Sequence, residues 1–183
     1  NTYLPSHFPR LAILVYSLAF ALYAETFLLE KLADIGLYSG MTEFFSESGI
    51  KMTLLFVLFL LFFMALAALK IISDTMIQLS LLFFSKDKEG ADLQKIRQGS
   101  WFYFISSFFA LILCKYIEAI LASFVIATLA YLVFYLYKIR DSLSLIGLFG
   151  MVLFHSLFWG TFLFTFIYAV TKLYNSFIAS LPL

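Results

Sequence analysis

Cysteine, proline and charged residues are scarce in this chain, and each scarcity removes a class of interpretation. The 183 residues include one cysteine, three prolines and 13% charged side chains. Because Cys114 is the only cysteine, no intrachain disulfide can form, and a zinc site is disfavoured with His7 and His155 far apart in sequence. Soluble domains carry about 25% charged residues, so the low charged fraction argues against a soluble protein.

Proline breaks and catalytic patterns are also scarce. We expect no span to be interrupted by proline, and the broken helices at which many transporters bind substrate are not indicated. We find no nucleophile–base arrangement, glycine-rich phosphate loop, paired carboxylates within a span or metal-ligand spacing. We therefore expect no enzyme and no cofactor, and without a basic stripe no nucleic-acid partner. The prolines, all near the chain ends, are Pro5, Pro9 and Pro182.

Long apolar blocks dominate the sequence instead. Hydrophobic residues make up 63% of the chain, and its mean hydropathy is +1.00. The clearest block, residues 52–69, reads MTLLFVLFLLFFMALAAL and is apolar on every face. A helix needs about 20 such residues to cross about 30 Å of hydrocarbon. The predicted fold class is therefore all-α, a single-domain polytopic integral membrane protein surrounded by the lipid bilayer.

Five transmembrane helices account for the apolar blocks. The predicted spans are residues 8–29, 50–72, 100–114, 117–137 and 144–170. One helix from Trp101 to Tyr137 would be about 55 Å long, so we expect a tight turn at 115–118, with a kinked, tilted pair as the alternative. The first block, after Arg10, also has features of a cleavable signal peptide, but we expect it to be retained as a span.

Lysine and arginine set the predicted orientation. Seven lie on one side of the five spans and four on the other, where acidic residues dilute them. The positive-inside rule then places the N-terminus in the cytoplasm and the C-terminus outside. The seven are Arg10, Lys86, Lys88, Lys95, Arg97, Lys138 and Arg140, and the four are Lys31, Lys51, Lys115 and Lys172.

Two connecting segments carry local signals. Residues 31–49 form the predicted outer loop, in which Met41–Ser48 reads as a short helix that Gly49 terminates. Residues 73–84 mix polar and apolar side chains, so they either continue the second span into the cytoplasm or lie on the membrane surface as an interfacial helix.

Small residues recur every four positions on the third and fourth spans. Helices in membranes associate where small residues let their backbones approach, so we expect these two stripes to face each other across the predicted turn. A dimer or partner interface on one stripe is the functional alternative to packing within the chain. The stripes are Ser106, Ala110 and Cys114 on the third span and Ala119, Ser123 and Ala127 on the fourth.

Two ionisable residues lie inside predicted spans and are the candidate intramembrane polar site. Glu25 lies in the outer part of the first span, and His155 lies near the middle of the fifth. Such groups cost about 2.5–3.5 kcal/mol to insert, which indicates function by default. Glu25 accepts a proton or cation, or else pairs with Lys115 or Lys51. His155 relays protons, or else stays neutral and hydrogen-bonds a neighbouring hydroxyl or carbonyl.

Two stretches resemble the YufK-like proteins, a small family of membrane proteins from Bacillus and relatives. They are FALYAETFLLEKLADIGLYSGMTEFF (Phe20–Phe45) and LSLLFFSKDKEG (Leu79–Gly90). The resemblance extends over most of the chain. It implies a bacterial plasma membrane and transfers no site residues.

The first functional interpretation is a non-catalytic accessory or scaffolding subunit that associates with other membrane proteins or with itself. Small size, apolar helices and small-residue stripes favour it. The alternative is a small transporter, channel or substrate-binding subunit that uses Glu25 and His155. A third interpretation is a lipid-binding or envelope-stress protein that uses residues 73–84.

Overall fold

The computed structural model describes residues 4–180, with side chains from residue 7 onward, and its regular elements there are helices. The predicted all-α fold is therefore confirmed. One isolated β-bridge joins Ser85 to Leu143. In chain order the helices are α1 (Leu4–Asp34), α2 (Leu37–Phe44), α3 (Glu47–Phe84), α4 (Ala91–Arg97), α5 (Ser100–Ile112), α6 (Ile117–Ile139), the short 3-10 helix η1 (Arg140–Ser142) and α7 (Leu145–Ser180).

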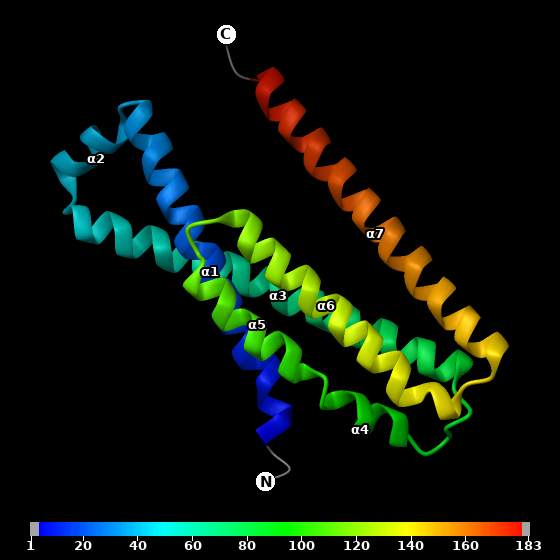
Figure 1. Ribbon diagram of the computed structural model, residues 1–183. Coiled ribbons are helices and arrows are strands. Elements are labelled where there is room, and N and C mark those ends of the chain that lie inside the picture. Colours follow the sequence, from blue (N-terminus) through cyan, green and yellow to red (C-terminus); the bar gives the residue numbers. More distant parts are fainter. Residues whose placement is uncertain (1–3, 181–183) are drawn as a thin grey trace.

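The chain runs back and forth between two ends of the molecule (Figure 1). Helices α1 and α3 are joined at one end through α2, and α4 and α5 lead back toward that end. Helix α1 packs against both α3 and α5, and α5 packs against α6. Residues Leu113–Tyr116 separate α5 from α6, so a tight turn is formed rather than a kinked pair. It lies two residues earlier than the predicted 115–118, because α6 already begins at Ile117.

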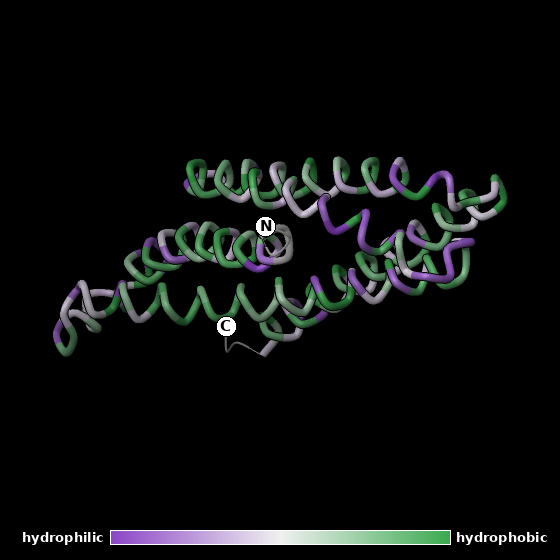
Figure 2. The backbone as a smooth tube through the Cα atoms, turned by 90° about the horizontal axis from the view of Figure 1, so that it is seen from below, coloured by the Kyte–Doolittle hydropathy of each residue, from purple (hydrophilic) through white to green (hydrophobic). Residues whose placement is uncertain are grey.

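Four helices within residues 4–180 are long and apolar enough to cross a membrane: α1, α3, α6 and α7. Figure 2 shows hydrophobic segments along the long helices and hydrophilic segments gathered at connections. The third predicted span, residues 100–114, corresponds to α5, whose 13 residues extend only about 20 Å, less than the roughly 30 Å of hydrocarbon. The five-span count therefore stays a prediction.

Residues 31–49 connect α1 to α3 and contain a short helix, but most of the segment is helical and the short helix lies at Leu37–Phe44 rather than at Met41–Ser48. Helix α1 continues to Asp34, and α2 begins after Gly36 and ends at Phe44. Gly36 has φ 76°, a left-handed conformation that glycine adopts without steric cost. Gly49 does not terminate a helix. It lies in the first turn of α3, where its N–H donates to the side chain of the capping residue Ser46 at 3.2 Å.

Residues 73–84 continue α3 without a break, the first of the two alternatives, and do not form a separate interfacial helix. Lys70 and Asp74, one turn apart on this helix, form an ion pair. Pro9 lies inside α1, which runs from Leu4 to Asp34 without interruption. Pro182 lies outside the described residues.

Two apolar clusters hold the bundle together. One joins α1, α5 and α6 through Tyr16, Ala19, Ala110 and Ile120. The other joins the second half of α3 to α4, α6 and the first half of α7 through Ile77, Ile96, Tyr135, Ile139 and Met151. Helix α6 therefore links the two clusters, since it contributes Ile120 to the first and Tyr135 to the second.

Candidate functional site

His155 lies on α7 in contact with α3 and α6. Its Nε2 atom is 3.0 Å from Oγ of Ser80, and the Tyr135 hydroxyl is 2.9 Å from the same oxygen. Ser80 is fully buried and Tyr135 is 1% exposed. The rings of Tyr135 and His155 meet edge to face with centroids 5.8 Å apart. One serine oxygen thus connects three helices, and we call these three residues the hydroxyl–imidazole cluster.

The proton inventory of this cluster fixes the roles of its members. Ser80 Oγ has one proton, and it donates to the carbonyl oxygen of Ile77 at 2.8 Å. Its two lone pairs then accept from Tyr135 and from His155. This assignment makes Nε2 of His155 the donor to Ser80. His155 therefore hydrogen-bonds a neighbouring hydroxyl, and its role as a proton relay or as a structural residue stays a prediction.

The predicted packing stripes lie where α5, α6 and α1 meet. The hydroxyl of Tyr16 on α1 donates to Ser106 at 2.8 Å and lies 3.4 Å from Ser123, so α1 contacts one serine from each stripe. Ala110 is fully buried and Ala127 is 3% exposed. Cys114 and Ala119 are partly buried near the α5–α6 turn. The stripes thus pack with a third helix, α1, through Tyr16.

The α6 stripe extends further than its small residues. Ser123 and Ala127 are followed, at the same spacing of four, by Tyr131 and Tyr135. All four lie on one face of the helix. The Tyr131 ring is stacked on Tyr135 with centroids 6.5 Å apart. The spacing of four residues along α6 therefore predicts that Tyr135 lies on the same face as the small residues of the stripe.

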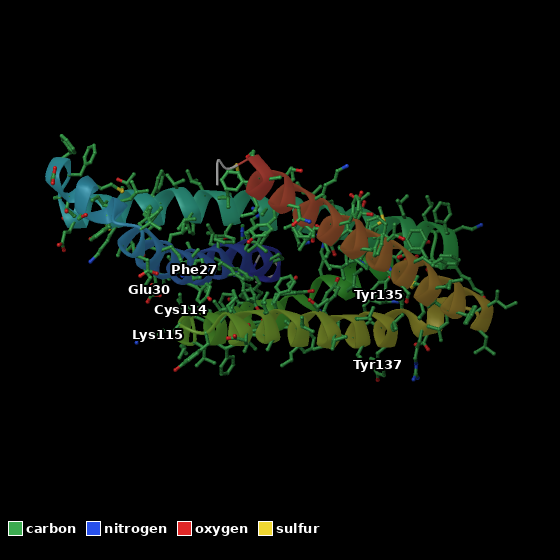
Figure 3. All side chains as sticks on the ribbon, turned by 90° about the horizontal axis from the view of Figure 1, so that it is seen from above. Phe27, Glu30, Cys114, Lys115, Tyr135 and Tyr137 are labelled. Atoms are coloured by element: carbon green, nitrogen blue, oxygen red, sulfur yellow. The ribbon has the colours of Figure 1, made fainter. Side chains whose placement is uncertain are left out.

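Glu25 lies in a different part of the molecule from the hydroxyl–imidazole cluster. It lines a shallow groove formed by the end of α1, by α2 and by the start of α3. Figure 3 shows Glu30, from the same groove, at one end of the bundle and Tyr135, the neighbour of His155, toward the other. The structure therefore does not bring Glu25 and His155 together. The groove is lined by Glu25, Thr26, Leu29, Glu30, Ala33, Tyr38 and Lys51.

The expected ion pair of Glu25 is not formed. In the described part of the chain, neither Glu25 nor Glu30 has a salt-bridge partner within 4.0 Å, although Lys51 lines the same groove. The groove therefore carries two carboxylates and one ammonium group at the surface.

The sequence interpretation missed a buried carboxylate, Asp92 on α4. Its side chain is 2% exposed. Its Oδ2 accepts from Ser85 Oγ at 2.7 Å, and its Oδ1 accepts from Ser142 Oγ and Lys95 Nζ, both at 2.9 Å. Because Ser85 follows α3 and Ser142 precedes α7, Asp92 connects two loops that are far apart in sequence. We call these four residues the Asp92 cluster.

Asp87 in the α3–α4 loop and Lys95 on α4 have shifted pKa values. Backbone N–H groups of Asp92 and Glu89 donate to the Asp87 carboxylate at 2.7 and 2.9 Å, and these hydrogen bonds hold the pKa of Asp87 below its ordinary value. The hydrogen bond and charge of Asp92 raise the pKa of Lys95 above its ordinary value.

These shifts predict how pH affects stability. Ionised Asp87 stabilises the fold above its unfolded pKa of about 3.8, and this contribution is lost as pH falls through its lower folded pKa. Charged Lys95 stabilises the fold below its unfolded pKa of about 10.5. This contribution is lost as pH rises through its higher folded pKa. We expect Asp87→Asn to lower the melting temperature in mild detergent between pH 5 and 8, with the difference from wild type narrowing below about pH 4.

The matched control is Glu89→Gln in the same loop, because the Glu89 side chain is exposed and its backbone N–H, which binds Asp87, is retained. If the difference in melting temperature between Asp87→Asn and wild type widened below about pH 4, the predicted effect of Asp87 ionisation on stability would have the wrong sign.

The second half of α7, residues 161–180, lies outside the packed bundle, and we call it the arm. Every arm residue except Phe162 is exposed, whereas the first half of α7 contributes buried Gly147 and Met151. Figure 1 shows the arm, in orange to red, diverging from α1 and α3 toward its end.

The arm has two unlike faces. At 100° per residue, one face collects hydroxyl, amide and amine groups, and we call it the polar face. The opposite face collects large apolar side chains, of which Leu173 is 71% and Phe177 64% exposed. Lys172, the arm's only charged residue, lies over the Tyr168 ring at 6.0 Å. The polar face comprises Thr161, Thr165, Tyr168, Lys172, Asn175 and Ser176.

Comparisons with known proteins agree with the sequence resemblance. A family of unknown function (DUF5366) matches residues 25–182. The uncharacterised membrane protein YufK of Bacillus subtilis (strain 168) is 43% identical over 182 residues, which cover 100% of this chain and 98% of the relative. No solved structure matches. The predicted resemblance is confirmed, and the apolar helices together with this relative indicate a membrane location.

Proposed function

Because the chain belongs to DUF5366, a family of unknown function, we propose a function from the molecular surface: it is a non-catalytic accessory or scaffolding subunit of a membrane assembly. The arm is the surface that associates with another membrane protein or with another copy of the chain. The location that fits the bacterial relative is the plasma membrane, with a multi-pass arrangement.

The two faces of the exposed arm carry this proposal. Where the arm lies in hydrocarbon, the polar face turns hydroxyls, an amide and an ammonium group toward lipid, which offers no hydrogen bonds. Where it lies in water, the opposite face leaves Leu173, Tyr174 and Phe177 at least 64% exposed. Whether the arm lies in lipid or in water, one of its two faces meets an unfavourable solvent. A protein partner that covers the arm removes this cost for both faces.

The proposed topology keeps five crossings. Helix α3 ends at the end of the molecule opposite to the one where α6 begins, so α4 and α5 must return the chain between them (Figure 1). We assign α5, though short, to that crossing, with the N-terminus in the cytoplasm and the C-terminus outside. The arm then reaches the outer surface.

The transport alternative requires Glu25 and His155 to act along one passage. Glu25 lies in the surface groove near α2, whereas His155 is hydrogen-bonded to Ser80 between α3 and α6. The geometry of these residues therefore favours the accessory role.

Site-specific photo-crosslinking in living cells tests the accessory role. A photoreactive amino acid replaces Thr165 on the polar face or, as the control, Leu163 on the opposite side of the same helix turn. We expect a protein adduct at position 165 and a much weaker one at 163. The absence of a protein adduct at both positions, with the chain in the membrane and folded, would contradict the proposal.

A further inference from the structure

The groove near α2 and the polar face of the arm are complementary surfaces of the same chain. The groove holds Glu25 and Glu30, neither of which has a salt-bridge partner in the described residues. The arm offers Lys172, which lies over the Tyr168 ring and forms no salt bridge within residues 7–180. Thr26 and Ala33 are small groove residues that let a helix approach closely. Thr26 and Tyr38 add hydroxyl groups to the lining of the groove.

The two surfaces also lie toward the same end of the molecule. Figure 1 shows α2 and the end of α7 both in its upper part. The sequence places Lys51 of the groove and Lys172 of the arm on the same predicted outer side. Two copies that insert in one bilayer with the same orientation present the groove of one copy and the arm of the other at a similar level.

One chain cannot join its own arm to its own groove in this structure. The first half of α7 is fixed against the end of α3, where Gly147 and Gly150 approach Phe84 closely. From that attachment the arm diverges from α1, and Figure 1 shows its end apart from α2. Closure within the chain would break the α3–α7 contact and the hydrogen bond between His155 and Ser80.

We infer that the arm binds a second copy of this chain, with Lys172 of one copy pairing with Glu25 and Glu30 in the groove of the other. This inference rests on the proposed function and names its partner. Contacts of this kind join identical chains either reciprocally in a dimer or head to tail in a ring.

Heterotypic crosslinking between two tagged forms of the full-length chain tests the contact. In a Cys114→Ala background, one form carries Lys172→Cys and the other Glu30→Cys, and both are expressed in the same cells. A short bis-maleimide should give an adduct that contains both tags. The control pair, Lys88→Cys with Glu30→Cys, joins an α3–α4 loop to the groove and should give none. A chain with both cysteines that links only within itself would overturn the inference.

Charge exchange provides the second measurement. Lys172→Glu alone or Glu30→Lys alone should reduce the mixed adduct of tagged chains, with reporter cysteines at Thr165 and Thr26, by about fivefold. Lys172→Glu combined with Glu30→Lys should restore most of it. Lys88→Glu should leave the adduct unchanged. Equal loss in the single and combined variants would show that these charges do not face each other.

The outcomes separate this inference from the proposed function. A Thr165 photo-adduct with a different protein, without a mixed-tag adduct, would overturn self-association and leave the accessory role standing. A lipid occupant would give no protein adduct at position 165 and would overturn both.

Discussion

Asp92→Ala should lower the free energy of unfolding by about 3 kcal/mol, the largest effect expected of a single polar substitution in this chain. Alanine removes the acceptor that Ser85, Ser142 and Lys95 share. The partly buried hydroxyls of Ser85 and Ser142 then lose a charge-assisted partner, and the α3–α4 loop keeps only its backbone contacts with the α6–α7 loop. Reversible unfolding by sodium dodecyl sulfate in mixed micelles measures the change. Asp92→Asn keeps one acceptor oxygen and should cost about half as much.

The control is Asp141→Ala, in the loop that the Asp92 cluster holds. The Asp141 side chain is 87% exposed, and its partner is the adjacent Arg140. Its removal should change the free energy of unfolding by less than about 0.5 kcal/mol. Equal effects of Asp92→Ala and Asp141→Ala would show that the buried carboxylate does not connect the loops.

The apolar sequence predicted the helices well because the cost of leaving backbone groups unpaired in lipid permits few other structures. The break between α5 and α6 was predictable for a related reason. A single helix across Lys115 and Glu118 is too long for the bilayer, and both charges need water. The short helix near Gly49 was misplaced because Ser46, followed by Glu47 in the first turn, begins α3 there.

The burial of Asp92 was not predictable, because an acidic residue in a segment rich in lysine and glutamate is expected to be exposed to water. Its burial depends on the meeting of two loops, which no local pattern encodes. The surroundings of His155 depend in the same way on Ser80 from α3 and Tyr135 from α6. The divergence of the arm was hidden for a different reason: apolar side chains that face lipid and those that face protein have the same composition.

Gly150→Val should lower the free energy of unfolding by about 2 kcal/mol, because it fills the space through which α7 contacts α3. A Cβ atom at Gly150 would lie 2.5 Å from Cε1 and 3.0 Å from Cδ1 of Phe84. The Phe84 ring would have to move away from Phe154, which it contacts edge to face with centroids 6.2 Å apart. The same unfolding titration in mixed micelles measures the loss.

Gly160→Val is the matched control, since a Cβ there meets nothing within 4 Å and both glycines lie inside the same helix. The difference between the two variants therefore isolates the contact with Phe84 from the backbone effect of replacing glycine in a helix. Phe84→Ala should remove much of the penalty of Gly150→Val, with a coupling of about 1 kcal/mol or more in a double-mutant cycle. Additive effects of the two substitutions would place the strain elsewhere, and the attachment that directs the arm away from its own groove would then need another cause.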